Sequence, residues 1–221
     1  MTTDPSFETR WLAEWDPRAL DEALLALRQG WPVVFATDTV YGVACDLWNS
    51  EAIERLYWAK RRPERLAIPV LVSDVAGVRA VAREEPPALA ALAARFWPGG
   101  LTLVLRRRPE VPAVLSAGGD TVAVRLPDHP FARRLIAAMG GALAVTSANL
   151  SGQPAPRTAQ EALAALGGRV ACVVDGGPCA LGVASTVVDL AARPPRVLRQ
   201  GALPFEALRA VLPDLLPALE G

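Results

Sequence analysis

Short apolar runs alternate along this chain with stretches in which apolar residues recur every three or four positions. A short run bounded by turn residues is typical of a buried strand, whereas the longer spacing is typical of an amphipathic helix. The runs predict strands over 31–36, 68–72, 101–105, 121–126, 142–146, 170–174 and 186–190, with a shorter one around Val197 and Leu198.

Capping residues mark the starts of the helices between these runs. Ser, Thr, Asp and Asn accept hydrogen bonds from the first N–H groups of a helix, and glycine commonly ends one. The predicted caps are Asp16 with Pro17, Ser50, Asp128 and Thr158, the last in a capping box with Glu161. Helices from Asp16 and Asp128 are expected to end at Gly30 and Met139, and two more begin near Val75 and Pro87.

This alternation predicts an α/β fold, in which a twisted sheet of mixed parallel and antiparallel strands has flanking helices and an open ligand cleft. No stretch has the composition of a linker. We therefore expect one catalytic domain over 16–212, an N-terminal extension over 1–15 and a C-terminal tail over 213–221. Ligands of such sheets bind beyond strand ends.

The composition limits which classes of partner the protein is expected to bind. The chain has 23 basic and 23 acidic side chains, so no net field favours a nonspecific nucleic-acid or membrane partner. Its first ten residues are polar and no apolar run is long enough to span a bilayer, so we expect a cytoplasmic protein without a membrane partner. The cysteines Cys45, Cys172 and Cys179 are expected to be free core thiols, and the single histidine, His129, to start a helix or turn.

One lysine stands among 22 arginines, in the segment Lys60-Arg-Arg-Pro-Glu-Arg65. The helix that begins at Ser50 places Lys60 and Arg62 at or just past its C-terminal end. Cations there complement the helix dipole without any ligand. The alternative is a phosphate clamp, in which arginine binds two oxygens and lysine acts as a point charge. The segment alone leaves both interpretations open.

Hydroxyl-rich loops follow or precede several strands, in the segments 36–42, 145–152 and 182–189. Such loops either satisfy their own backbone or present hydroxyls and N–H groups to a small anion. The chain has no GxxxxGK[ST], GxGxxG or GxSxG motif. A reaction that depends on positioning and electrostatic stabilisation of phosphoryl oxygens fits this inventory better than covalent hydrolysis.

Taken in order, the motifs resemble those of the YrdC-type L-threonylcarbamoyladenylate synthases. The resemblance runs from about Trp31 to Gly201, and the chain ends soon after, as in short members without an extra C-terminal domain. The motifs are Thr37-Asp-Thr-Val-Tyr-Gly42, Lys60-Arg-Arg-Pro63, Trp97-Pro-Gly-Gly-Leu-Thr102, Val122-Ala-Val-Arg-Leu-Pro127 with His129-Pro130, Ser147-Ala-Asn-Leu-Ser-Gly152, Ser185-Thr-Val-Val-Asp189 and Val197-Leu-Arg-Gln-Gly201.

The resemblance implies a YrdC-like fold and a nucleotidyltransferase that makes threonylcarbamoyl-AMP and pyrophosphate from L-threonine, bicarbonate or CO₂, and ATP. This is the first step of threonylcarbamoyladenosine formation in tRNA. It also implies Mg²⁺ on the ATP phosphates without protein side-chain ligands, transfer of the product to a tRNA threonylcarbamoyl transferase complex, and only an indirect role for tRNA.

The resemblance also implies roles for individual residues, which follow from their positions in the motifs. Lys60 and Arg62 are expected to be catalytic. The expected ATP-binding residues are Lys60, Arg62, Thr121, Ser147, Asn149, Ala155 and Arg199. The expected threonine-binding residues are Thr39, Leu71, Arg125, Val145 and Ser185.

The chain departs from the family pattern at Leu66, where many relatives have lysine. Arg65 is a candidate to replace that cation. Two other readings compete with the synthase. An RNA-binding module would use Arg106-Arg107-Arg108 and the Lys60 segment, and a paralogue of the same fold would perform a different acyl-adenylate chemistry.

Overall fold

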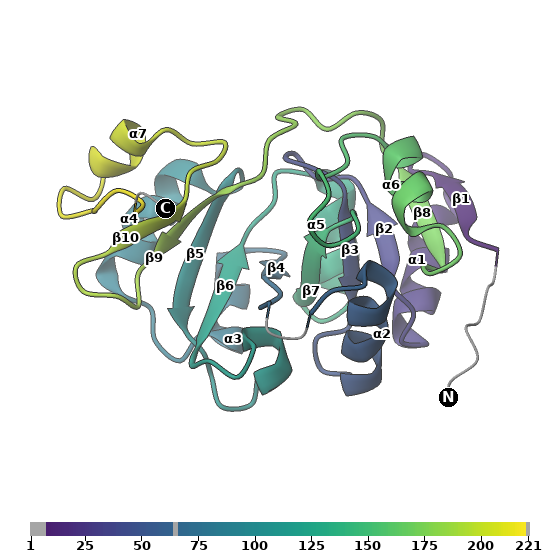
Figure 1. Ribbon diagram of the computed structural model, residues 1–221, viewed down its shortest axis with the longest axis horizontal. Helices are drawn as coiled ribbons and strands as arrows, with labels where there is room; N and C mark the ends of the chain where they lie inside the picture. Colours follow the sequence, from purple (N-terminus) through teal and green to yellow (C-terminus); the bar gives the residue numbers. More distant parts are fainter. Residues whose placement is uncertain (1–7, 64–65, 220–221) are drawn as a thin grey trace.

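All strands in the described residues, 8–63 and 66–219 of the computed structural model, join one ten-stranded sheet in the order β1-β8-β2-β3-β7-β4-β6-β5-β9-β10. Parallel pairs (β1·β8, β2·β8, β4·β6 and β5·β9) are mixed with antiparallel ones, and β1 and β10 are open edges. Figure 1 shows β1 at one end of the molecule and β10 at the other. The predicted mixed, open sheet is confirmed.

The strands are β1 (Arg10–Ala13), β2 (Val33–Phe35), β3 (Gly42–Cys45), β4 (Val70–Val72), β5 (Leu101–Arg106), β6 (Thr121–Arg125), β7 (Ala142–Ser147), β8 (Cys172–Asp175), β9 (Thr186–Asp189) and β10 (Arg196–Arg199). The α-helices are α1 (Ala19–Arg28), α2 (Ser50–Lys60), α3 (Val78–Val81), α4 (Pro87–Phe96), α5 (Pro130–Ala138), α6 (Ala159–Leu166) and α7 (Phe205–Arg209). Two 3₁₀ turns, η1 (Val75–Gly77) and η2 (Ala113–Ser116), complete the regular structure of the described residues.

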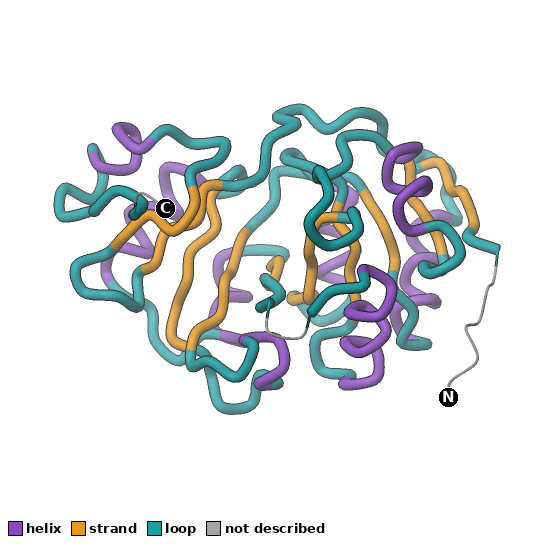
Figure 2. The backbone as a smooth tube through the Cα atoms, in the orientation of Figure 1, coloured by secondary structure: helices purple, strands orange, loops and turns teal. Residues whose placement is uncertain are grey.

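Helices cover both faces of the central strands, which is why these strands read as continuous apolar runs. Val33 and Phe35 pack with the apolar sides of α1 and α5. Val34, whose side chain points the other way, packs into a second cluster that includes residues of α2, α4 and α6. Figure 2 shows the helices on the outside of the strands, with long loops along one rim of the sheet.

Three predicted helix caps are displaced by one or two residues. Asn49 caps α2, accepting from the Ala52 N–H at 3.2 Å, so Ser50 is the first helical residue. His129 caps α5 through its side chain, as its helix-start prediction required, whereas the Asp128 N–H donates to Asp38 instead. The residue before α1 is Arg18, which makes no side-chain cap, and Asp16 accepts from its N–H at 2.9 Å.

Thr158 caps α6 as predicted, but only half of the capping box forms. Its hydroxyl accepts from the Glu161 N–H at 3.3 Å. The Glu161 carboxylate accepts from the Arg157 N–H at 2.7 Å rather than from Thr158.

Strands β1 and β3 and helix α7 had no counterpart in the sequence-based prediction. β1 is an edge strand with exposed Arg10 and Trp11, so it lacks the apolar run of a buried strand. It pairs with β8, and the sheet therefore begins before the expected domain boundary at residue 16. β3 is only four residues long and follows the Thr-Asp-Thr cluster directly.

The three cysteines are buried and free. In the described parts of the chain, no helix has the length and apolar character needed to cross a bilayer.

Candidate active site

A cavity of about 200 Å³ lies where loops meet the ends of strands in the middle of the sheet. Its walls come from the β2–β3 loop, from β4, β5, β6 and β7, from the residues before β9, and from β10. Nine of the twelve predicted site residues line it, namely Thr39, Leu71, Arg125, Val145, Ser147, Asn149, Ala155, Ser185 and Arg199. The fold thus brings together residues that are far apart in the sequence.

A buried ion pair between Asp38 and Arg125 lies at this cavity. The two side chains are 8% and 7% exposed, and the Arg125 Nη2 donates to Asp38 Oδ1. Arg125 also donates from Nε to the Gly99 carbonyl at 2.9 Å and from Nη1 to Thr39 Oγ1 at 2.6 Å. Burial lowers the pKa of Arg125, and the Asp38 carboxylate opposes this shift. A guanidinium has five N–H groups, so these three bonds leave two for a ligand in the cavity.

The Thr39 hydroxyl has a fixed hydrogen-bond polarity. Thr37 donates its only hydroxyl hydrogen to the Val40 carbonyl at 2.7 Å. Thr37 Oγ1 also accepts from the backbone N–H groups of Thr39 and Val40 at 3.2 and 3.3 Å, and in its shorter 3.0 Å contact with Thr39 Oγ1 the donor is Thr39. Thr39 Oγ1 also accepts from Arg125, so towards a ligand it can only accept one more hydrogen bond.

Thr102 and Ser185, which also line the cavity, form a second hydroxyl pair, 2.7 Å apart and buried. Arg199 donates to the Ser185 carbonyl at 2.9 Å from Nη2 and at 3.2 Å from Nε, and reaches Ser185 Oγ at 3.3 Å. These contacts hold the Arg199 guanidinium against the chain just before β9.

Lys60 lies behind the cavity wall rather than in it. Its side chain is 1% exposed, and its Nζ donates to the carbonyls of Ser147 and of Asn149, the latter at 2.6 Å. The Lys60 carbonyl in turn accepts from the Ser151 N–H at 3.0 Å. Burial, together with the nearby Arg62 charge, lowers the pKa of Lys60 to about 7. The ammonium therefore supports the turn after β7 from behind.

Two further predicted residues do not line the cavity. The Arg62 guanidinium donates to the carbonyls of Leu66 and Ala67, at 3.2 and 2.7 Å. Thr121 lies at the start of β6, opposite Arg106. Arg65, the candidate replacement for the lysine missing at Leu66, lies outside the described residues.

Positive charge in this region is not compensated. Across residues 8–63 and 66–219, no carboxylate lies within 4.0 Å of Lys60, Arg62 or Arg199. The Asp38 carboxylate is committed to Arg125. Only Arg199 of these three lines the cavity, but the unpaired charges together give the region a positive potential that suits a polyanionic ligand.

Asn149 leaves a buried acceptor without a partner. Its Nδ2 donates to the carbonyls of Leu150 and Gln153, at 2.8 and 2.7 Å, which fixes the orientation of the amide. Its Oδ1 is buried and has no donor in the described structure. Asn149, Gln153 and Ala155 also line an adjoining hollow of about 610 Å³. This wall is therefore equipped for a ligand that extends from the cavity into the hollow.

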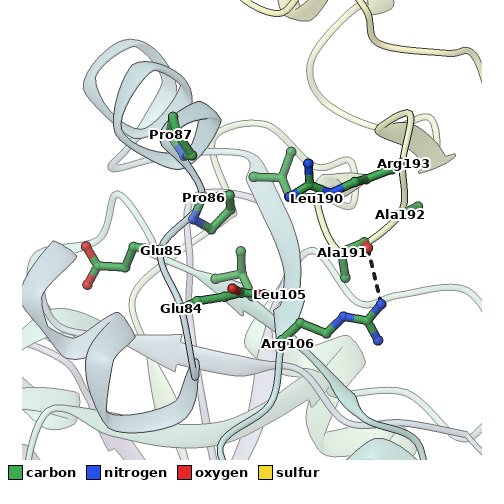
Figure 3. Close-up of a pocket in the computed structure, with 10 residues that line it drawn as sticks. All are labelled: Glu84, Glu85, Pro86, Pro87, Leu105, Arg106, Leu190, Ala191, Ala192 and Arg193. Atoms are coloured by element: carbon green, nitrogen blue, oxygen red, sulfur yellow. Dashed lines mark hydrogen bonds between the residues drawn. The ribbon is translucent and has the colours of Figure 1, made fainter.

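A separate hollow of about 580 Å³ lies between the segment that leads into α4 and the loop after β9 (Figure 3). It contains none of the predicted site residues. Two of its charged side chains, Glu85 and Arg106, already have partners in Arg79 and Asp120. The described residues also contain no group of three or more His, Cys, Asp or Glu side chains that could hold a metal.

Asp38, Thr37 and Thr102 lie in the matched motifs but were not among the predicted site residues. The first two lie in a polar cluster between apolar runs, and that interruption of a buried segment was the available signal. Thr102 had no such signal, because a threonine inside an apolar strand also fits a simple packing role.

Comparison with known proteins places this geometry in a family. Residues 25–201 match the family model Sua5–YciO–YrdC, described as "Telomere recombination". The chain belongs to this family. The threonylcarbamoyl-AMP synthase of Pyrococcus abyssi is 40% identical over 197 residues, and that of Bacillus subtilis is 41% identical over 199 residues. The alignments cover 88% and 89% of this chain but only 58% and 57% of those proteins, so the chain spans less than two thirds of their length.

A solved family structure agrees with the fold. The crystal structure of P. abyssi Sua5 in complex with L-threonine superposes with a TM-score of 0.90 at 37% identity, covering 95% of this chain and 62% of that one. The mixed, open sheet is therefore a shared feature of the family.

Replacing Asp38 with Asn should destabilise the fold, because it leaves the Arg125 charge buried without its counter-charge. We expect Asp38→Asn to lower the free energy of unfolding by about 3 kcal/mol, within the range for breaking one side of a buried pair. Chemical denaturation measures this change. The matched control is Asp120→Asn, which breaks the exposed pair with Arg106 and should cost less than about 1 kcal/mol. Equal losses in the two variants would contradict the account.

The lowered pKa of Lys60 predicts a pH dependence of stability. Between the folded pKa of about 7 and the ordinary lysine value, the unfolded chain binds the extra proton, so stability rises with pH. The unfolding free energy of the wild type minus that of Lys60→Met should therefore increase from pH 7 to pH 8.5, by at most about 1.4 kcal/mol per pH unit. The difference cancels groups that titrate alike in both proteins. A flat difference would show that the buried amine keeps an ordinary pKa.

Proposed function

We propose that this chain is an L-threonylcarbamoyladenylate synthase, a nucleotidyltransferase that converts L-threonine, bicarbonate or CO₂, and ATP to threonylcarbamoyl-AMP and pyrophosphate. The observation that carries the proposal is the charge distribution of the cavity. A charge-balanced, hydroxyl-lined pocket around Arg125 adjoins the unpaired Arg199, and Lys60 and Arg62 lie outside the lining without a counter-charge among the described residues, which suits a zwitterion next to a polyphosphate.

The pocket around Arg125 fits the amino acid. The two uncommitted N–H groups of Arg125 can donate to a carboxylate. Thr39 accepts only, which suits an N–H or hydroxyl donor of the substrate. Leu71 and Val145 add apolar surface for a methyl group. L-threonine carries all of these groups.

The wall formed by Ser147, Asn149, Ala155 and Arg199 fits the nucleotide. Arg199 can donate to phosphate oxygens, and the unpartnered Asn149 Oδ1 suits a hydroxyl or amino donor. The hollow beyond Ala155 provides room for the nucleoside. Lys60 positions the Ser147–Asn149 turn from behind, and its charge and that of Arg62 add to the positive potential.

The chemistry needs charge neutralisation more than a base. The neutral threonine amine adds to CO₂ and releases a proton to solvent, which gives a carbamate, an anionic nucleophile. Its oxygen attacks the α-phosphorus of ATP, and pyrophosphate leaves. Cations held close to the phosphates stabilise the charge of this transition state. Mg²⁺ enters as the ATP complex, since the carboxylate at the cavity, Asp38, is paired with Arg125.

The product is a mixed anhydride that passes to a tRNA threonylcarbamoyl transferase complex in the cytoplasm, with tRNA as an indirect partner. Direct RNA binding through Arg106-Arg107-Arg108 has less support. Arg106 and Arg108 are paired with Asp120 and Glu110, and Arg107 donates to the Gly119 carbonyl at 3.3 Å.

Product analysis tests the synthase directly. The protein is incubated with Mg-ATP, L-threonine and ¹³C-bicarbonate, and the products are separated and analysed by mass spectrometry. We expect an adenylate that contains threonine and one ¹³C atom, with pyrophosphate in equal amount. Pyrophosphate release that persists without threonine and bicarbonate would overturn the assignment, and an adenylate of another acid would support the paralogue reading.

A further inference from the structure

The hydroxyl pair Thr102–Ser185 leaves one hydrogen without an acceptor. Thr102 is 4% exposed and Ser185 6%, and both line the cavity. Two hydroxyl groups carry two hydrogens, and their mutual 2.7 Å bond uses one of them. The contact from Arg199 to Ser185 Oγ uses a nitrogen-bound hydrogen and consumes neither. No other acceptor in the described structure bonds to either hydroxyl.

The hydrogen that the mutual bond does not use can be on either residue. If Ser185 donates to Thr102, the Thr102 hydrogen is free, and the reverse arrangement frees that of Ser185. The geometry permits both, because either oxygen can be the donor in the mutual bond. The pair therefore presents one donor to the cavity in both arrangements.

The neighbours of the pair determine what it faces. Leu103 of β5 lies opposite Val124 of β6, and this register brings Thr102 beside Arg125. Arg125 has two uncommitted N–H groups, and Arg199 lies on the other side of Ser185. The free Arg125 N–H groups and the spare hydroxyl hydrogen are donors, and Arg199 adds positive charge, so this wall matches a group with several lone pairs and a negative charge.

The Thr39 side of the pocket has the opposite polarity, since its hydrogen is committed to Thr37. An amino acid can satisfy both sides in one orientation, with its carboxylate towards Arg125 and the hydroxyl pair and a donor towards Thr39. The reverse orientation would place carboxylate lone pairs against the Thr39 acceptor.

We propose that Thr102 and Ser185 act together as a single hydrogen-bond donor to the α-carboxylate of the amino-acid substrate, so that Thr102 is a further specificity-determining residue. This inference rests on the proposed function, which supplies the amino acid. It adds a role for Thr102 and makes the two hydroxyls interchangeable.

A double-mutant cycle on L-threonine binding tests this interchange. Isothermal titration calorimetry compares the wild type with Thr102→Val, Ser185→Ala and the double variant. Each single variant keeps one hydroxyl, so its Kd should stay within about threefold of wild type. The double variant loses the bond to a charged group and should bind about 10- to 100-fold more weakly, far beyond the product of the single effects.

The matched control is Thr102→Ser with Ser185→Ala, which changes both positions but keeps one hydroxyl. It should bind like Ser185→Ala alone, and circular dichroism should give the same folded signal for all variants. A Thr102→Val variant as weak as the double variant, or effects that simply multiply, would overturn the shared-donor role. If the wild type binds no L-threonine, the proposed function fails and this inference with it; threonine binding with multiplicative effects removes only the inference.

Discussion

The buried pair between Asp38 and Arg125 is the contact on which the site depends. Two charges removed from water are tolerated only when they are paired and their remaining hydrogen-bonding groups are satisfied. Arg125 meets the first condition through Asp38, and Thr39 and the Gly99 carbonyl accept two more of its N–H groups; its two remaining N–H groups are left for a ligand, and Asp38 Oδ2 has no partner in the described structure. Asp38 also accepts from the Asp128 N–H at 3.1 Å, which connects the β2–β3 loop to the chain that enters α5. One ion pair thus joins the loop, the end of β6 and the start of a helix.

This pairing divides the cavity into two electrostatic regions. Around Arg125 the charges balance, and selection depends on the direction of each hydrogen bond. Around Arg199, Arg62 and Lys60, positive charge has no counter-charge among the described residues, so an anion is favoured before any specific contact forms. Lys60, when protonated, adds to this potential from behind the wall while its amine holds the carbonyls of the anion-facing turn. The same side chain therefore has a structural and an electrostatic role.

Sequence reasoning succeeded where local patterns carry the information. Strands buried on both faces read as apolar runs, and most of the residues that line the cavity lie in loops next to those runs. It failed where tertiary contacts, rather than the local sequence, determine the structure. Edge strand β1 has no apolar run, and a cap such as Asn49 competes with the equally suitable Ser50 beside it. A basic segment past a helix end does not reveal that Lys60 turns inwards. The Asp38–Arg125 pair joins residues 87 positions apart, so no local sequence pattern predicts it.

The two-region account is tested most directly by the salt dependence of ligand binding, measured by calorimetry for ATP and for L-threonine on the same protein. Salt screens uncompensated charges far more than a buried, balanced pair. Raising the ionic strength from about 0.05 M to 0.5 M should weaken ATP binding by roughly tenfold or more, while the Kd of L-threonine changes by less than about twofold. Equal salt dependence of the two ligands would contradict the division of the cavity into a charge-balanced pocket and a cationic wall.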